Sequence, residues 1–359
     1  MSRKLSNSSS ASLDFLRATS AQAVVIGHGI SFCGVAVSLH QPNFPWMQNI
    51  AVVIFFILSG FLITYSLSQK NFEVYRFSHY VADRFSRIYV AFIPALLFVV
   101  ALDSISVAMN REMYAYHAAL NLKTFFGNIL MLQDFPKLNI VTSFGSGRPF
   151  WTLAIEWWIY LFVGAIYFWM FTKKPTKYQF VILMFLSIVP LYNLLGGRGN
   201  GLTLYWIFGA LVQYVWSNHW LSTVRLRYLI ILFILTSISA AYVVLSTLVE
   251  YSPVFAFMLG LSLLLLIEIT SRVELGRLFQ ASGYFLAAYS YTLYLIHYSI
   301  FDFLKISIGG GYGTFFIGFV ASNLLACLIG RYVELSVTMK TKDLLYRHLN
   351  RKLKSSTPI

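Results

Sequence analysis

Long apolar runs separated by short polar segments make up most of the chain. A helix of about 20 apolar residues is long enough to cross the ~30 Å hydrocarbon core of a bilayer, and ten runs have roughly that length. They predict ten membrane-spanning helices at residues 13–37, 47–68, 88–109, 150–171, 178–195, 202–217, 228–248, 254–270, 284–304 and 312–336. The predicted fold class is therefore all-α, a polytopic bundle of about ten transmembrane helices.

The composition agrees with a membrane protein. Hydrophobic residues make up 58% of the chain and charged residues only 11%, whereas a typical soluble domain has about 25% charged residues. We divide the chain into an N-terminal segment (1–12), a transmembrane domain (13–337) and a basic tail (338–359). The tail is predicted to form an amphipathic helix on anionic lipid. The apolar stretch "TFFGNILML", within the outer segment 110–149, is expected to lie at the membrane surface.

The net charge of +14 is distributed by side of the membrane. Of the 27 Lys and Arg residues, 19 fall on the side of the two termini, six on the other side, and two within spans. Basic residues accumulate in cytoplasmic loops, so both termini are predicted to be cytoplasmic. This distribution argues against a nucleic-acid partner, whereas the family resemblance given below implies a multi-pass protein of a bacterial inner (plasma) membrane. Both cysteines fall within spans, so no disulfide framework is predicted.

Three ionisable residues, Asp14, Arg17 and His28, interrupt the first predicted helix. Such a group costs roughly 2.5–3.5 kcal/mol to insert into hydrocarbon, so it indicates a functional site or a buried pair. Arg17 and His28 are eleven residues apart. In a helix they lie within ~20° of each other on one face and ~16 Å apart along the axis. Asp14 precedes Arg17 by three residues and is placed to pair with it.

Two further titratable residues fall at the same predicted depth as His28. Counting 1.5 Å per residue from the cytoplasmic end of each span gives ~22 Å for His28, ~20 Å for His297 and ~21 Å for Glu156. Titratable groups that converge in a water-poor layer are what acid–base chemistry requires. The alternative is that each histidine is a structural core residue hydrogen-bonded to a neighbouring helix.

A second group of charged residues falls at the predicted cytoplasmic rim. Arginine pairs are well suited to binding phosphate, although the positive-inside rule alone would also explain arginines here. The Trp and Tyr residues nearby are interpreted as an interfacial belt or as packing. Arg331 and Glu334 are explained equally well as a structural ion pair. The rim group consists of Arg17 with Asp14, Arg84 with Arg87, and Arg331 with Glu334.

Six sequence blocks, in order, resemble the acyltransferase-3 family of integral membrane acyltransferases. The first has the Arg-(ten residues)-His signature that opens the family. The departures are Phe15 and Ala18, where the family usually has glycine, and Leu335, where proline is common. The blocks are "LDFLRATSAQAVVIGH" (13–28), "FFILSGFLIT" (55–64), "RFSRIYVAFIP" (84–94), "WTLAIEWWIYLF" (151–162), "YSYTLYLIH" (289–297) and "RYVEL" (331–335).

The resemblance implies that an acyl group, usually acetyl, moves from cytoplasmic acyl-CoA to a hydroxyl of a bacterial surface sugar, such as that of lipopolysaccharide. By position, Arg17 and His28 match the essential pair of the first helix, and Arg84 and Arg87 match a pair linked to the CoA side. Three more residues match recurrent polar positions: Glu156, His297 and Glu334.

The resulting hypothesis places CoA phosphates on Arg84 and Arg87, with help from Arg17, and the thioester near His28. His28 acts as general base on the acceptor hydroxyl or accepts the acyl group itself. No metal is predicted, because a thioester is already activated and no zinc-like ligand spacing occurs. The alternative is a transporter or flippase for a lipid-linked sugar, in which intramembrane charges would line the substrate path. A catalytically inactive receptor is less favoured, because it leaves the buried charges without a role.

Overall fold

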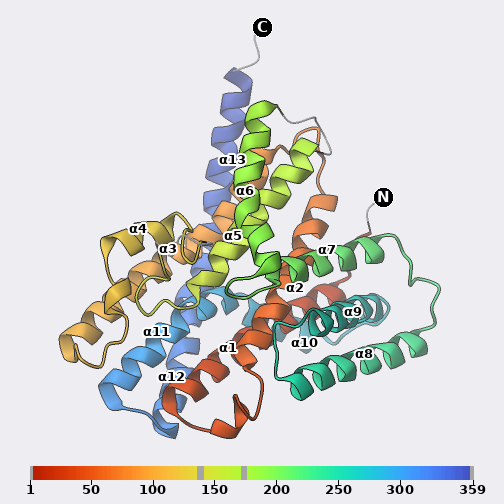
Figure 1. The fold of residues 1–359 in the computed structure, drawn as a ribbon. Coiled ribbons are helices and arrows are strands. Elements are labelled where there is room, and N and C mark those ends of the chain that lie inside the picture. The colour runs from red at the N-terminus through yellow and green to blue at the C-terminus, as the bar shows by residue number, and fades with distance from the viewer. Residues whose placement is uncertain (1–2, 136–140, 171–175, 356–359) are drawn as a thin grey trace. The chain divides into compact units, whose positions relative to one another are not determined.

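The computed structural model describes residues 3–135, 141–170 and 176–355 (Figure 1). All regular elements within these ranges are helices, which confirms the all-α class. Lys137, Lys173 and Lys174, which contributed to the charge count, lie outside the described residues.

Each of the ten predicted spans overlaps at least one helix, with different bounds in most cases. Seven helical segments in the described residues are long and apolar enough to cross a membrane. Predicted spans 13–37, 202–217 and 284–304 do not meet that criterion, because their helices are shorter or more polar. The helices are α1 (Asn7–Cys33), α2 (Met47–Ser68), α3 (Phe77–Met109), α5 (Phe150–Ala165), α6 (Lys177–Leu195), α7 (Leu202–Ser217), α8 (Leu226–Thr247), α9 (Pro253–Thr270), α11 (Ser290–Ile308) and α12 (Tyr312–Leu325).

Local sequence explains where α1 begins and ends. The Ser6 side chain accepts a hydrogen bond from the Ser9 N–H at 3.0 Å, which satisfies one of the unpaired donors of the first turn. At the other end, Gly34 adopts a left-handed conformation (φ 64°) and its N–H bonds the Ile30 carbonyl. The helix therefore starts in the polar serine segment, six residues before the predicted span.

Several elements extend or interrupt the predicted pattern. α3 begins eleven residues before the predicted span, and a separate helix, α10 (Arg277–Ala287), precedes α11. The outer segment contains the short helix α4 (Leu122–Ile129). After α12 the chain continues through wider π-helical turns, η4 (Ala326–Gly330) and η5 (Tyr332–Val337), into α13 (Thr338–Ser355). The basic tail is thus helical, as predicted, and continues directly from the last span.

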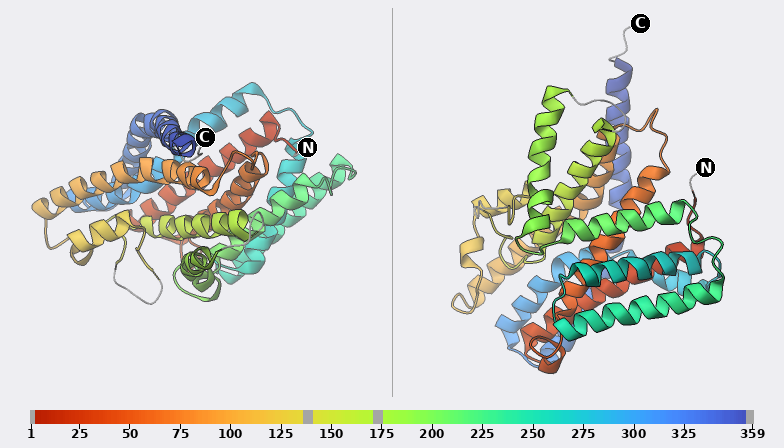
Figure 2. Two further views of the ribbon diagram at one scale, coloured as in Figure 1. Left: turned by 90° about the horizontal axis from the view of Figure 1, so that it is seen from above. Right: turned by 45° about the vertical axis from the view of Figure 1, so that its right-hand side comes forward.

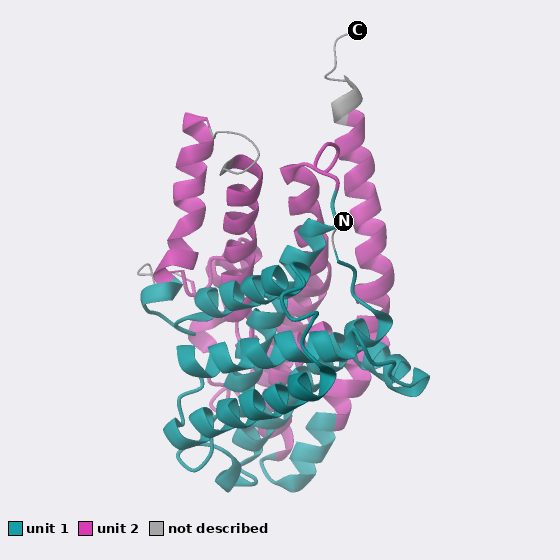
Figure 3. Cartoon of the chain, turned by 90° about the vertical axis from the view of Figure 1, so that its right-hand side faces the viewer, with its two compact units in different colours: residues 1–70, 193–290, 309–319 teal, residues 71–192, 291–308, 320–359 magenta. Residues whose placement is uncertain are grey.

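The chain divides into two compact units, each described here by itself (Figure 3). Unit 1 comprises residues 1–70, 193–290 and 309–319, and unit 2 comprises residues 71–192, 291–308 and 320–359.

Helices of unit 1 approach each other closely at small residues. α8 and α9 lie side by side (Figures 1 and 2). Where α2 meets α7, a Cβ added to Gly60 would lie 1.9 Å from the Trp206 carbonyl oxygen. A Cβ on Gly209 would lie 1.9 Å from the Ile57 carbonyl oxygen. Backbone contacts of this kind between membrane helices depend on the absence of side chains.

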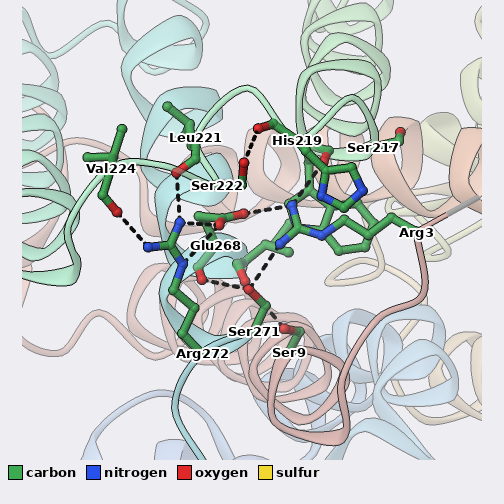
Figure 4. A network of polar contacts seen from close by, with 12 residues as sticks. Arg3, Ser9, Ser217, His219, Leu221, Ser222, Val224, Glu268, Ser271 and Arg272 are labelled. Atoms are coloured by element: carbon green, nitrogen blue, oxygen red, sulfur yellow. Dashed lines mark hydrogen bonds and ion pairs between the residues drawn. The ribbon is translucent and has the colours of Figure 1, made fainter.

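A buried carboxylate ties the N-terminus of unit 1 to α9 (Figure 4). Glu268 accepts from Arg3 at 2.7 Å and from Arg272 at 2.5 Å. The Arg3 guanidinium carbon also lies 4.5 Å from the centre of the Trp216 ring. Arg272 donates to the carbonyls of Leu221 (2.7 Å) and Val224 (2.5 Å). Both arginines therefore compensate the charge of Glu268, which is almost completely buried.

In unit 2, a second buried carboxylate joins α13 to α3. Asp83 accepts hydrogen bonds from the hydroxyls of Tyr75 and Tyr346, both at 2.8 Å, and pairs with Lys342 at 3.0 Å. Next to it, the His79 ring packs edge-on against Tyr346, with centroids 5.0 Å apart. The tail helix is therefore held on α3 by polar contacts on one of its faces.

Candidate active site

The two arginines of α3 in unit 2 lie against aromatic rings. The guanidinium carbon of Arg84 is 5.6 Å from the centre of the Tyr80 ring and 5.8 Å from that of Tyr160. That of Arg87 is 5.6 Å from the centre of the Tyr291 ring. Arg84 Nε has no hydrogen-bond partner among the described residues. Flat cations held over rings keep their N–H groups in a fixed orientation and available to an anion.

Glu156 lies one helical turn before Tyr160 on α5, and the Tyr160 hydroxyl donates a short hydrogen bond to it. The backbone carbonyl of Tyr160 in turn accepts from the Tyr80 hydroxyl at 3.0 Å. Tyr160 therefore connects Glu156 to the ring pair on which Arg84 lies. Tyr160, one of the aromatic residues interpreted from the sequence as interfacial belt or packing, thus makes a specific contact with Glu156.

Glu334 links α3 to the start of α11. Its carboxylate accepts from the Thr292 N–H at 2.7 Å and pairs with Arg87 at 3.9 Å. Thr292 is in the first turn of α11, where backbone N–H groups have no partner within the helix and the helix dipole favours an anion. The π-helical turns of η5 present this buried carboxylate, while Arg331, just before them, is exposed.

α11 carries polar side chains along one face. Tyr291, Tyr294 and Tyr298 recur at spacings of three and four residues, which places them on one side of the helix. Tyr291 is within electrostatic range of Glu156, Arg87 and Glu334. We call this row, with the adjacent His297, the α11 polar face.

His297 is completely buried within the α11 polar face. Its Nδ1 lies 3.1 Å from the Leu293 carbonyl, and its ring centre is 6.1 Å from that of Tyr294 and 6.5 Å from that of Tyr298. The Tyr294 hydroxyl is 2.7 Å from that of Thr152 on α5. Six residues, or ~9 Å of helix, separate His297 from Tyr291, whose neighbours include Glu156.

In unit 1, Asp14, Arg17 and His28 all lie on the continuous helix α1. Arg17 pairs with Asp14 at 3.2 Å and donates to the Ala287 carbonyl at 3.3 Å, at the C-terminal end of α10. A cation is favoured there by the helix dipole. His28 is half-buried and follows Gly27, where an added Cβ would lie 2.2 Å from Gln48 Oε1 of α2. Because α1 is unbroken, Arg17 and His28 share one face, as their spacing predicted.

Unit 2 thus brings together Arg84, Arg87, Glu156 and Glu334 around tyrosines that the sequence analysis had interpreted as packing. It also contains two buried acids that the analysis did not select, Asp103 on α3 and Asp302 on α11. Both lie within predicted spans, so the rule that selected Arg17 and His28 would also have selected them. Tyr291 offered no comparable signal, because tyrosine is common at membrane interfaces.

The unit 2 cluster has the properties of an anion site connected to a row of hydroxyl groups. Two guanidinium groups provide charge and directed donors, and the Glu334 carboxylate pairs with Arg87. Two guanidinium groups, each with a planar pair of N–H donors, are well suited to binding phosphate. On α1, His28 provides an imidazole, which in its neutral form can accept a proton.

Comparison with known proteins identifies the family of the chain. Residues 10–331 match the family model described as an acyltransferase domain. Searches of curated proteins and of solved structures gave no match. The matched region covers the first five sequence blocks in full and only Arg331 of the "RYVEL" block. The chain belongs to the acyltransferase-3 family, and it is a membrane acyltransferase.

Proposed function

We propose that the protein moves an acyl group, expected to be acetyl, from cytoplasmic acyl-CoA to a hydroxyl of a cell-surface polysaccharide or lipid-linked sugar. The observation that carries the proposal is the arginine pair of α3, in a chain whose family transfers acyl groups. The donor would bring several phosphates, and an arginine with an unpartnered N–H is a suitable ligand for them.

On the donor side, Arg84 and Arg87 bind the phosphates of CoA. Stacking on tyrosine rings supports this role, because a guanidinium held in one plane loses little conformational freedom on binding. Arg17 is proposed to assist from α1, where Asp14 and the Ala287 carbonyl hold its side chain. Arg331 and Glu334 are assigned structural roles, and the contacts of Glu334 with Arg87 and Thr292 support this for Glu334.

In the chemical step, His28 takes the proton of the acceptor hydroxyl, and the oxygen of that hydroxyl attacks the carbonyl carbon of the thioester. The carbon–sulfur bond then breaks, and the imidazolium returns the proton to the CoA thiolate, so that the histidine is regenerated. Transient acylation of His28 is the alternative route. Glu156 and His297 are proposed to orient the imidazole or the acceptor. The proposal that these two residues act together with His28 is based on their equal predicted depth in the sequence analysis.

Purified protein in nanodiscs, supplied with acetyl-CoA labelled in the acetyl group, tests the reaction. The wild type should release CoA and transfer or hydrolyse the label. His28→Ala should lower that rate by about 10²–10⁴-fold, the usual contribution of a general base. His348→Ala, at an exposed histidine of α13, is the matched control and should retain the wild-type rate.

Two results would overturn the proposal. If the wild type does not cleave the thioester but moves a lipid-linked sugar across vesicles, the protein is a transporter. If His28→Ala retains the wild-type rate, His28 is not the base. In cells, mass spectrometry of the surface glycan should show ester groups with the wild type and their loss with His28→Ala.

A further inference from the structure

A second polar cluster of unit 2 lies at the opposite end of the α11 polar face from the arginines. Asp103, near the end of α3, and Asp302, near the end of α11, are 1% and 6% exposed. Asp302 is eleven residues after Tyr291 on α11, or ~16 Å along the helix axis. Nothing in the proposed donor chemistry uses either acid.

Asp103 is held by the segment that leads into α5. The Ser146 N–H and hydroxyl donate to its two oxygens at 2.8 and 2.5 Å. Gly145 has a positive φ of 51°, and a Cβ there would lie 1.9 Å from Asp103 Oδ2 and 3.1 Å from the Tyr114 hydroxyl. The missing side chain of Gly145 therefore allows the carboxylate and the phenol to converge on one point.

Hydroxyl groups surround the two acids. Ser146 Oγ lies 2.7 Å from Ser299 Oγ, and the hydroxyls of Tyr116 and Tyr298 are 3.1 Å apart. The rings of Tyr114 and Tyr116 pack edge-to-face with centroids 5.7 Å apart. We call Asp103, Tyr114, Tyr116, Ser146, Ser299 and Asp302 the acid–tyrosine cluster.

One acid of this cluster has an oxygen without a partner. Asp302 Oδ2 is buried and has no hydrogen-bond partner among the described residues. The Tyr114 hydroxyl, on a side chain that is 1% exposed, interacts with the Asp103 carboxylate. Asp302 Oδ2 is an acceptor, and the Tyr114 oxygen can also accept a hydrogen bond, so a ligand with several hydroxyl groups suits both.

The electrostatics favour an uncharged ligand with hydroxyl groups. Lys305 is within electrostatic range of Asp302 and partly compensates its negative charge, whereas Asp103 adds to the charge. Burial and the nearby carboxylates raise the pKa of Tyr114 and Tyr116 well above the usual value, so both phenols remain neutral donors. Carboxylates, neutral phenols and aromatic faces together provide what a sugar requires: acceptors, donors and apolar ring surfaces.

We propose that the acid–tyrosine cluster binds the sugar of the acyl acceptor through hydrogen bonds from the sugar hydroxyls to Asp302 and to the Tyr114 oxygen. The inference rests on the proposed function, since it names the acceptor subsite of that reaction. Ser299 and Tyr298 directly follow His297. Two residues that follow the buried imidazole in the chain therefore contact the proposed sugar site or belong to it.

The test measures transfer of labelled acetyl from acetyl-CoA to methyl glycosides of glucose, galactose, mannose and rhamnose. Asp302→Asn and Tyr114→Phe should each raise the KM for the accepted glycoside by at least tenfold, while the KM for acetyl-CoA stays within about twofold. Glu112→Gln, at an exposed carboxylate of the same loop, is the matched control and should leave both constants unchanged.

The other possible results either overturn the proposed sugar site or assign the cluster a different role. Wild-type KM values for the glycoside in both variants would overturn the proposal, and so would a wild type that hydrolyses acetyl-CoA but acylates no glycoside. A saturable dependence of transfer on Na⁺ or Mg²⁺ that Asp302→Asn abolishes would assign the cluster to a cation instead. Equal rises in both KM values would show a general loss of structure. Failure of the wild type to cleave acetyl-CoA would reject the proposed function itself.

Discussion

At the scale of single residues, the central question is whether Arg84 and Arg87 act through their shape or only through their charge. Positive-inside topology requires charge alone, which lysine supplies equally well. Binding of phosphate by a guanidinium also requires its planar pair of donors, and Tyr80, Tyr160 and Tyr291 hold these side chains over their rings. Exchanging arginine for lysine therefore separates the two roles.

We predict that the Arg84→Lys and Arg87→Lys double variant inserts normally but has a KM for acetyl-CoA raised about 10- to 100-fold. Each charge-assisted hydrogen bond contributes about 1.5–3 kcal/mol, and 1.4 kcal/mol corresponds to a factor of ten. Steady-state kinetics on purified protein give the constant. Arg347→Lys, at an exposed arginine of α13, is the control. An unchanged KM would restrict the pair to topology.

The sequence predicted those residues whose charge conflicts with an apolar setting. Arg17, Arg87 and Glu334 stand out on that criterion, and the structure places each in a specific contact. Tyr291 does not stand out, because a tyrosine in a membrane helix is unremarkable until its neighbours are known. Glu334 contacts the first turn of α11 from the π-helical turns of η5. The sequence could not predict this contact, because no residue pattern indicates those turns.

At the scale of elements, hydropathy located the helices but not their full lengths. The core of each apolar run was found because lipid contact requires apolar side chains over ~30 Å. The first eleven residues of α3 and the whole of α13 are helical without being apolar, because contacts within unit 2 stabilise them. α10 was merged with the following span, since no proline or glycine cluster marks the break near Ala288.

The contact between α2 and α7 explains a glycine in the second sequence block. Gly60→Ala and Gly209→Ala would each place a methyl group 1.9 Å from a backbone oxygen, so the helices must separate. We predict that each variant loses about 1–3 kcal/mol of stability, lowering the Tm in detergent by roughly 3–10 °C. Gly313→Ala is the control, because no atom lies within 4 Å of its added Cβ. Equal melting temperatures in all three variants would contradict close packing.

The attachment of α13 to α3 depends on Asp83. We predict that Asp83→Ala releases the tail helix, because two tyrosine hydroxyls and Lys342 lose their common acceptor. Limited trypsin digestion should then cut within residues 338–355 at least tenfold faster than in the wild type, since local opening governs cleavage. Asp343→Ala, at an exposed aspartate of α13, should match the wild type. Equal protection in both variants would show that other contacts hold the tail.

At the scale of the whole molecule, the proposed reaction divides its residues between the two units. Unit 1 contributes His28 and Arg17 on α1, and unit 2 contributes the arginine pair, the α11 polar face and the acid–tyrosine cluster. The sequence could not anticipate this division, because unit 2 is assembled from three separate stretches of the chain. The two levels of polar residues, at the cytoplasmic rim and deeper in the membrane, stay a prediction from counting along each span.

The orientation of the chain in the membrane decides whether Arg84 and Arg87 face the cytoplasm, where acyl-CoA is found. If the 19-to-6 bias of basic residues sets the topology, Lys340 lies in the cytoplasm and Lys123 lies outside. We predict that Lys123→Cys, at an exposed position of the outer segment, reacts with a membrane-impermeant maleimide in intact cells. Lys340→Cys, also exposed, should react only after permeabilisation. Cys33→Ala and Cys327→Ala in both variants remove background labelling. The opposite pattern would place Arg84 and Arg87 on the side without CoA, and phosphate binding by this pair could then have no part in the reaction.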